Sequence, residues 1–289
     1  MVTLSSSSTL LAAMGRARSI TLGAYLLHSG RILQALESAS RRGARVVVRA
    51  EARPFGQAGG PVARANARNV DALARLGADA RLVDCNESDE APMHMKAAVC
   101  DGVAYLDDRN WPDSGADTLL RDTTRTDIAA IRAALDGRVA TPSNTFWTQK
   151  ADALRGETAV LRGAKRAACV DVESEYLGRG SGVYGALDAL ARAGVRCRLL
   201  VSKRDVAPRE ADALKRLAAD GVGVRAGNLQ EKFAIAGARA AWIGSANATT
   251  PYYDGAQLDW GIRTARKDVV SALQQRFDAA WIAARPWSA

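Results

Sequence analysis

The stretch His94-Met-Lys96-Ala-Ala-Val-Cys-Asp101-Gly102 sets a histidine and a lysine two residues apart, before a short apolar run and a turn. Because alternate residues of a β-strand point to the same face, a strand here would bring the imidazole of His94 beside the ammonium of Lys96. Asp101 would stand at the strand's end, either bracing the turn or orienting a histidine. Attack on a phosphate group needs a nucleophile and fixed cations, since the phosphate oxygens are negatively charged. The stretch therefore predicts phosphate chemistry.

The later half of the chain carries an altered copy of this stretch, Gln230-Glu231-Lys232, followed by Gly244-Ser245-Ala246-Asn247. The copy keeps the lysine, but it has glutamine in the place of the histidine and Gly237 in the place of the aspartate. The first copy is followed instead by Asp107-Asp108-Arg109-Asn110. Two related motifs in one chain predict that the chain arose by duplication.

The pattern His-x-Lys-x4-Asp with a downstream Gly-Ser-x-Asn resembles the signature of the phospholipase D superfamily, over roughly residues 18 to 283. The resemblance implies that two motifs build one phosphodiester-cleaving site without a metal or another cofactor. It implies that one histidine attacks phosphorus to give a phosphohistidine, while a second protonates the leaving group and later activates water. It assigns catalysis to His94, Lys96 and Asp101. Its implied phosphate-binding residues are Asn110, Lys232, Ser245 and Asn247.

The departures from the family pattern concern the proton donor. Gln230 can donate a hydrogen bond but cannot transfer a proton, and a positioned general acid is worth about 10²–10⁴ in rate. Asp107 and Asp108 stand where the family has Gly-Ser, and they are candidates for a replacement acid, because a desolvated carboxyl beside another carboxylate has a raised pKa. Glu231 alternates to the face opposite Lys232 and is a poorer candidate.

Two further aspartates and two tryptophans lie close to the motifs in sequence. Asp122 and Asp259 occupy what we interpret as matching places in the two halves, where they either brace the site or form structural ion pairs. Trp111 and Trp260 are candidates for lining the cleft. The two aspartates are accessory site candidates, together with Gln230, Asp107 and Asp108.

Both halves of the chain show the same order of elements, strand, helix, strand, helix, then the motif and a closing helix. This order predicts an α/β fold with helices on both faces of mixed sheets. We therefore expect a duplicated, pseudo-twofold bilobal protein made of residues 1–140 and 141–289, divided at the polar stretch 136–144.

The 289 residues carry a net charge of +9 and have a pI near 9.7, which favours a polyanionic partner. The basic charge favours nucleic acid over phospholipid, although the acidic stretch 86–90 before His94 would repel a polyanion locally. The four cysteines show no metal-binding spacing, which indicates a reducing compartment, and the apolar run 10–13 is too short for a membrane span. We expect a cytoplasmic monomer.

These observations predict a phosphodiesterase of nuclease or phospholipid type that hydrolyses or transfers through a phosphohistidine on His94, with reduced activity. The alternative is a catalytically inactive protein that binds phosphate or nucleic acid. The sequence leaves both open, because the second histidine is replaced by Gln230.

Overall fold

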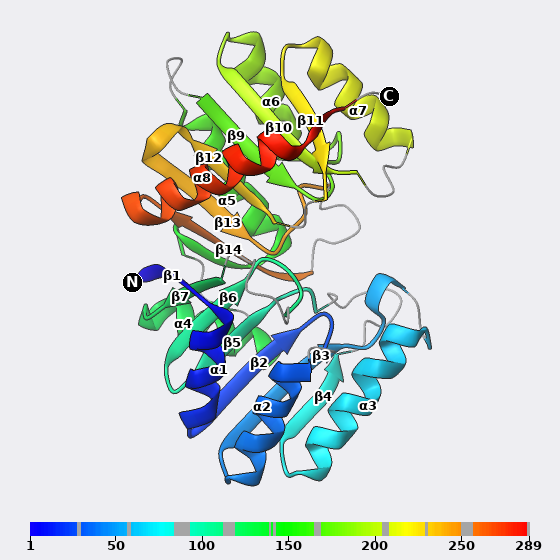
Figure 1. The fold of residues 1–289 in the computed structure, drawn as a ribbon, viewed down its shortest axis with the longest axis vertical. Coiled ribbons are helices and arrows are strands. Elements are labelled where there is room, and N and C mark those ends of the chain that lie inside the picture. The colour runs from blue at the N-terminus through cyan, green and yellow to red at the C-terminus, as the bar shows by residue number, and fades with distance from the viewer. Residues whose placement is uncertain are drawn as a thin grey trace. The chain divides into compact units, whose positions relative to one another are not determined.

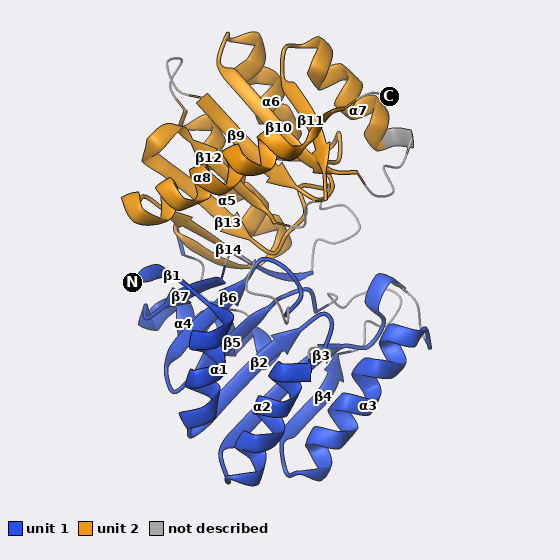
Figure 2. Cartoon of the chain, viewed as in Figure 1, with its two compact units in different colours: residues 1–143, 255–260 blue, residues 144–254, 261–289 orange. Residues whose placement is uncertain are grey.

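The protein is described by a computed structural model that covers residues 1–27, 30–56, 59–83, 93–111, 119–138, 140, 143–164, 169–203, 208–228, 231–249 and 257–287. The chain forms two compact units, which Figure 2 shows in different colours. Unit 1 consists of Met1–Ser143 and Gly255–Trp260, and unit 2 of Asn144–Asp254 and Gly261–Ala289. The predicted division at residue 140 and the predicted twofold relation of the halves stay predictions.

Unit 1 is a seven-stranded mixed sheet with helices on both faces (Figure 1). The central strand β2 pairs in parallel with β3 on one side and antiparallel with β5 on the other. In sheet order the strands are β1 (Val2–Ser5), β7 (Leu119–Asp122), β6 (Val103–Asp107), β5 (Ala97–Cys100), β2 (Ser19–Ala24), β3 (Arg45–Glu51) and β4 (Asp79–Val83). The helices are α1 (Ser7–Arg16), α2 (Gly30–Arg41), α3 (Pro61–Arg75) and α4 (Arg125–Leu135), with a short 3-10 turn, η1, at Pro54–Gly56.

Unit 2 repeats this architecture with one strand more. Its sheet order is β8 (Phe146–Gln149), β14 (Leu258–Thr264), β13 (Ala240–Gly244), β12 (Phe233–Ala236), β9 (Cys169–Ser174), β10 (Arg196–Ser202), β11 (Gly223–Gly227) and β15 (Arg285–Pro286). Its helices are α5 (Lys150–Arg162), α6 (Gly182–Arg192), α7 (Pro208–Ala219) and α8 (Lys267–Ala283), with a 3-10 turn, η2, at Gly237–Arg239.

The two sheets have the same strand order, β1 to β7 corresponding to β8 to β14, and the same parallel and antiparallel neighbours. The predicted duplicated α/β fold is confirmed. Gly43 and Gly194 occupy corresponding positions after α2 and α6, with φ of +80° and +81°. A left-handed residue ends each helix there, and glycine adopts that conformation without a steric cost.

Each sheet packs three helices on one face and one on the other. In unit 1, apolar residues of α1, α2 and α3 form one core with the inward face of β2, β3 and β5. Helix α4 covers the opposite face, where the Leu135 side chain lies so close to Gly23 that a β-carbon on Gly23 would approach it to 2.6 Å. Gly23 thus lets α4 approach β2 directly.

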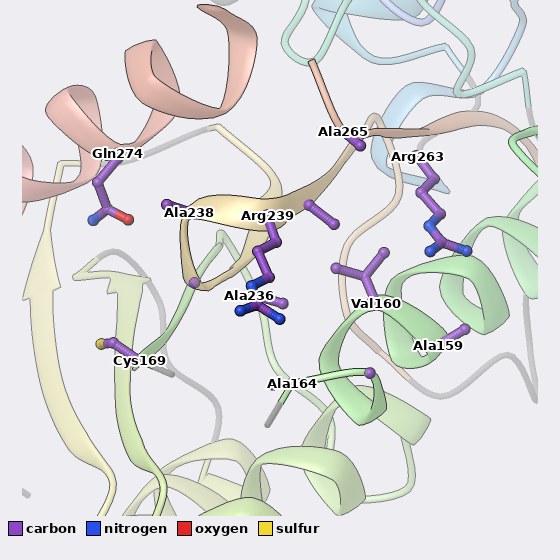
Figure 3. Close-up of a pocket in the computed structure, with 13 residues that line it drawn as sticks. Ala159, Val160, Ala164, Cys169, Ala236, Ala238, Arg239, Arg263, Ala265 and Gln274 are labelled. Carbon is purple, nitrogen blue, oxygen red and sulfur yellow. The ribbon is translucent and has the colours of Figure 1, made fainter. Parts of the chain in front are cut away.

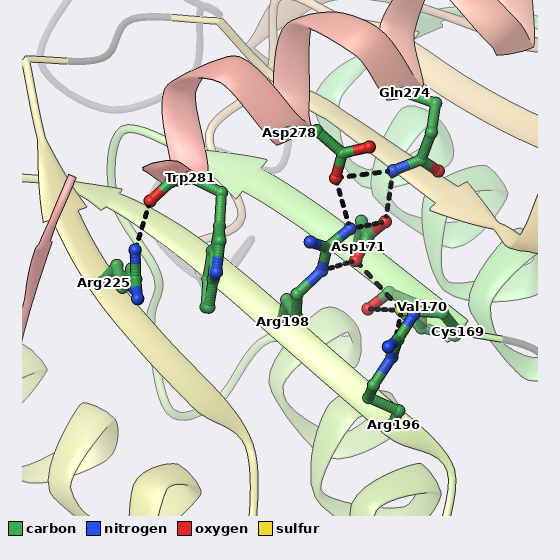
Figure 4. Close-up of polar contacts among 9 residues, drawn as sticks. All are labelled: Cys169, Val170, Asp171, Arg196, Arg198, Arg225, Gln274, Asp278 and Trp281. Carbon is green, nitrogen blue, oxygen red and sulfur yellow. Dashed lines mark hydrogen bonds and ion pairs between the residues drawn. The ribbon is translucent and has the colours of Figure 1, made fainter. Parts of the chain in front are cut away.

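Helix α8 covers the second face of the unit 2 sheet through a network of charged groups, drawn in Figure 4. The guanidinium of Arg198 on β10 donates to both oxygens of Asp171 at 2.7 and 2.8 Å and to Asp278 of α8 at 2.7 Å. The same guanidinium lies 4.8 Å from the ring centre of Phe277 and 5.4 Å from that of Trp281. Where α8 meets the sheet, the charge of Arg198 is therefore neutralised by two carboxylates, and its guanidinium lies over two aromatic rings.

Glu157 of α5 lies in a different environment, because its side chain is only 1% exposed and its Oε2 has no hydrogen-bond partner among the described residues. Burial raises the pKa of this carboxyl from its ordinary value near 4.5 to about 8. The native state therefore holds the Glu157 proton more tightly than the unfolded chain does. The stabilisation this gives is complete below pH 4.5 and is lost as the pH rises towards 8.

We expect Glu157→Gln to remove most of this pH dependence and to be more stable than the wild type at pH 9. The expected gain is a few kcal/mol, at about 1.4 kcal/mol per unit of pKa difference. Urea denaturation of both proteins at pH 5 and pH 9 measures it. Unfolding free energies that change equally with pH in the two proteins would contradict the assignment.

Candidate active site

His94 lies just before β5, with its imidazole between a carboxylate and an ammonium group. Its Nδ1 is 2.7 Å from Oδ1 of Asp259, and its Nε2 is 2.9 Å from Nζ of Lys96. The Asp259 side chain is fully buried and that of His94 is 15% exposed. A carboxylate can only accept from Nδ1–H, so this contact directs the lone pair of Nε2 towards Lys96. The ring is thus held in the tautomer that a nucleophile at Nε2 requires.

Lys96 is only 1% exposed, and an aromatic ring lies beside its ammonium. Its Nζ is 5.4 Å from the ring centre of Tyr25, and that ring meets the His94 imidazole edge to face, with centres 4.8 Å apart. A cation over an aromatic face is stabilised by the ring quadrupole, and more strongly when it is desolvated. Tyr25 therefore contacts both members of the His-x-Lys pair.

The backbone around His94 is fixed by buried polar groups that the sequence did not single out. Glu51, at the end of β3, accepts hydrogen bonds from Met93 N at 2.5 Å and from Arg53 N at 2.9 Å. Asn66 of α3 accepts from Leu27 N at 2.8 Å and donates to Glu51 O at 2.8 Å. Two features of the sequence could have identified these residues. They are a glutamate at the end of the apolar run of β3 and an asparagine inside a helix.

The first residues of β14 belong to unit 1 and lie next to the motif. Met93 forms a parallel bridge with Leu258, whose carbonyl oxygen accepts from His94 N at 3.0 Å. Trp260 is fully buried, and its Nε1 donates to Asp107 O at 2.9 Å. Asp259 is thereby placed opposite His94 by a backbone contact on one side and a tryptophan anchor on the other.

The two carboxylates after β6 are both buried, at 2% exposure for Asp107 and 0% for Asp108. Oδ1 of Asp107 accepts from Arg109 N at 2.8 Å, so this carboxylate braces the turn that follows the strand. Asn110 lies at the end of that turn, and its buried Oδ1 has no hydrogen-bond partner among the described residues. Their predicted roles as acid or phosphate ligand stay predictions.

Asp101 lies away from His94, which corrects the expectation that it takes part in catalysis. It follows β5, whereas His94 and Lys96 precede that strand, and four strand residues span about 13 Å at about 3.3 Å per residue. Its carboxylate accepts from the backbone N–H groups of Arg18 and Ser19 at 3.0 and 2.8 Å. Asp101 therefore braces the turn between β5 and β6, which is one of the two roles considered for it.

Asp122 does not correspond to Asp259, so the predicted match between them is wrong. Asp122 pairs with Ala104 of β6, and the corresponding pairing in unit 2 is that of Thr264 with Ala241. Both segments contain a leucine shortly before an aspartate, and this shared pattern aligned them in the wrong register.

The Asp122 carboxylate belongs to a separate cluster at the chain's start. Its Oδ1 accepts from the Met1 amine at 3.2 Å and from the Thr124 hydroxyl at 2.7 Å. Burial, and then the hydrogen bond and charge of Asp122, raise the pKa of Asp127 to about 6. Asp122 thus anchors the N-terminus, and the structure gives it no contact with His94.

In unit 2, Lys232 occupies the place of Lys96. The backbone oxygen of Lys232 accepts from Gly244 N at 3.1 Å, as that of Lys96 accepts from Asp107 N at 3.0 Å. Lys232 is 3% exposed, and its Nζ lies 3.5 Å from Oε2 of Glu175, which follows β9 as Tyr25 follows β2. The second lysine therefore faces a carboxylate where the first faces an aromatic ring.

The remaining predicted residues of unit 2 flank Lys232 in sequence or on the neighbouring strand. Ser245 is fully buried, and Oδ1 of Asn247 is buried without a hydrogen-bond partner among the described residues. Glu231 forms an ion pair with Arg276 of α8 at 2.9 Å, away from the Lys232 partner, as strand alternation predicts. Gln230 lies outside the described residues, so its predicted accessory role stays a prediction.

Trp111 does not line a cleft. It is 2% exposed, its Nε1 donates to Gly23 O at 3.0 Å, and it belongs to the apolar core of unit 1. Trp260 is equally buried, as described above. Both tryptophans therefore support the site from within the core.

Unit 2 also contains a cavity of about 630 Å³ that is separate from Lys232 (Figure 3). It lies by the turn between β12 and β13, whereas Lys232 precedes β12. Small side chains such as Ala159, Ala236 and Ala240 form much of its wall, and its charged lining residues are Arg239 and Arg263. None of the predicted site residues lines it.

Within the described parts of the chain, no group of three or more His, Cys, Asp or Glu residues is arranged to hold a metal ion. Cys100, Cys169 and Cys197 are free thiols. None of the helices in the part of the chain that the structure describes has the length and apolar character to cross a bilayer.

Residues 159–281 match a family model described as a cardiolipin synthase, PLD-like domain. The fold resembles phosphatidylserine synthase of Haemophilus influenzae Rd KW20, with a TM-score of 0.68 and 10% identity over 99% of this chain and 87% of that one. Residues 159–281 therefore contain a phospholipase D-like domain.

The phospholipase D-like fold also resembles polyphosphate kinase from Porphyromonas gingivalis, with a TM-score of 0.66 and 15% identity over 96% of this chain. This chain spans about half of that protein, 46% of its length. No curated protein matches the sequence. At these identities the likeness establishes the fold alone.

Proposed function

We propose that the protein cleaves or transfers phosphodiester bonds through a covalent phosphohistidine on His94. The observation that carries this proposal is the imidazole held between Asp259 at 2.7 Å and Lys96 at 2.9 Å. The phospholipase D-like domain at residues 159–281 supports a phosphodiester or phosphate substrate.

Asp259 acts as a positioning residue for the nucleophile. Its carboxylate holds the proton on Nδ1 of His94, so that the Nε2 lone pair is available to attack phosphorus. As the Nε2–P bond forms, the imidazole becomes cationic, and the adjacent carboxylate stabilises that charge. The bond from phosphorus to the leaving oxygen then breaks, and that oxygen takes up a proton.

Lys96 serves two roles in succession. Before substrate binds, its ammonium donates to Nε2 of His94 and covers the nucleophile. A phosphodiester oxygen competes for the same ammonium, and when Lys96 turns to that oxygen it uncovers Nε2. The cation then neutralises the charge that develops on the phosphoryl oxygens. Substrate binding and activation of His94 are thus linked through one side chain.

The second half-reaction returns His94 to its free state. Water attacks the phosphohistidine, the Nε2–P bond breaks, and a phosphomonoester and a proton leave; an alcohol in place of water gives transfer. The second histidine that the family uses here is replaced by Gln230. We propose slow turnover, with Asp107 and Asp108 as the candidates for a substitute acid.

The alternative function is phosphate or nucleic-acid binding without turnover. It is favoured by Glu175, which lies 3.5 Å from Lys232 and offsets the cation that would otherwise contact a phosphate. A protein of this kind would bind a diester and form no covalent intermediate.

The experiment that separates these functions is detection of the intermediate. The wild type is mixed with an excess of methyl p-nitrophenyl phosphate, quenched in base and examined by intact-mass spectrometry. We expect an added methylphosphoryl group that is stable in base, labile in acid and mapped to His94. An unmodified mass at all times, with no nitrophenolate released, would support the binding protein instead.

A further inference from the structure

An exposed aromatic side chain stands beside the candidate nucleophile. Phe55 is 65% exposed, and its ring meets the Tyr25 ring edge to face with centres 5.4 Å apart. Tyr25 in turn contacts the His94 imidazole at 4.8 Å. Phe55 is therefore one aromatic contact removed from His94, with its own ring open to solvent.

The position of Phe55 is fixed by the same groups that fix the site. Glu51 accepts hydrogen bonds from both Arg53 N and Met93 N, and the Phe55 N–H donates to the Tyr25 hydroxyl. The backbone of Phe55 is in the left-handed region, with φ +60° and ψ 22°. This conformation is uncommon for a bulky residue and costs free energy. This backbone conformation keeps the ring against Tyr25 at one edge and leaves most of the ring in water. Packing against Tyr25 therefore accounts for only part of the strained conformation.

We infer that Phe55 is a stacking platform for a nucleobase next to the scissile phosphodiester, and hence that the substrate is a single-stranded nucleic acid or a nucleotide ester. This inference rests on the proposed function, since it places the scissile phosphate at His94. Base stacking on an aromatic ring is tolerant of sequence, and the net charge of +9 favours a polyanion. A ring held rigidly loses little entropy when a base stacks on it.

A lipid surface fits these observations less well. Among the described residues the large hydrophobic side chains that are exposed are Met1, Phe55, Leu82 and Ile282, and Phe55 is the aromatic one. Membrane-surface binding draws on an apolar helix face or on several inserted side chains. A single aromatic ring in contact with Tyr25 offers one flat face, which is suited to stacking with one base and too small to bind a bilayer surface.

The test compares two ligands that differ only in their bases. A fluorescein-labelled oligothymidylate and an abasic oligomer of equal length are titrated against each protein, with fluorescence anisotropy as the readout. We expect Phe55→Ala to weaken oligothymidylate binding about 5- to 100-fold, the range of one lost stacking contact. The abasic oligomer should bind both proteins alike, because it has no base to stack.

Two variants serve as controls. Phe55→Trp keeps an aromatic face and should restore oligothymidylate binding. Ile282→Ala removes an even more exposed apolar side chain, from unit 2, and should change neither titration. Equal losses for both oligomers, unchanged binding of both, or no binding of oligothymidylate by the wild type would each overturn the inference. So would a Phe55→Ala defect that is confined to vesicles of phosphatidylglycerol.

The inference and the proposed function fail separately. Base-dependent binding through Phe55 together with no phosphohistidine would refute the proposed cleavage and leave the stacking platform standing. Phosphohistidine formation without base-dependent binding would refute the platform alone.

Discussion

Asp259→Asn lowers kcat/KM for a nitrophenyl phosphodiester by about 10²–10⁴, the range of a mispositioned acid–base group. The carboxylate can only accept from Nδ1 of His94, and so it selects the tautomer with a free lone pair on Nε2. An asparagine amide can instead donate to Nδ1, which moves the ring proton to Nε2 and blocks the nucleophile. Steady-state rates with methyl p-nitrophenyl phosphate measure the loss.

Two control variants make the result specific to tautomer control. His94→Asn removes the nucleophile and sets the lower limit of the rate. Asp101→Asn alters the other aspartate of the motif, whose carboxylate binds the backbone of Arg18 and Ser19, and it should change thermal stability and not the rate. Turnover by Asp259→Asn within a few-fold of the wild type would rule out the positioning role.

The second large effect concerns the leaving group. Because Gln230 cannot supply a proton, a nitrophenyl diester that needs little protonation should turn over faster than an alkyl diester. The expected ratio beyond their intrinsic reactivities is about 10²–10⁴, the contribution of a general acid. Gln230→His restores a proton donor and should narrow this ratio. Parallel rate measurements on wild type and variant with both esters provide the test.

Similar wild-type rates for the two esters, after correction for intrinsic reactivity, would mean that another residue already supplies the proton. The buried carboxylates Asp107 and Asp108 are the candidates in that case. Their substitution by asparagine, one at a time, would then identify the donor, while Glu231→Gln serves as a matched control because Glu231 pairs with Arg276.

The sequence predicted the fold because its signals are local and occur twice. Strand, helix and motif follow in the same order in both halves, and Gly43 and Gly194 mark the same helix end. The pairing of His94 with Lys96 was also predictable, since residues two apart on an extended chain share a face. Mixed sheets with helices on both faces were predicted from these elements, whereas the order of the strands in each sheet was not.

What sequence could not supply were the partners brought in from elsewhere in the fold. Asp259 reaches His94 from a distant segment, and no local pattern announces that contact. Tyr25 directly follows β2, and Glu51 is the last residue of the neighbouring strand β3. Both residues therefore lie at the carboxyl ends of these strands, next to the motif. Asp122 was misassigned because a leucine shortly before an aspartate in both segments does not determine strand register, which depends on the tertiary pairing of β6 with β7.

Strand β14 begins in unit 1 and ends in unit 2, since Leu258–Trp260 belong to one and the residues from Gly261 to the other. A gene fragment that encodes residues 1–143 would therefore specify His94 and Lys96 without the carboxylate that orients the imidazole. Neither half of the gene can therefore be inherited, lost or recombined alone with the contact between His94 and Asp259 intact. Natural selection acts on the pair as a single heritable unit, which allows one motif to decay while its segment is still required.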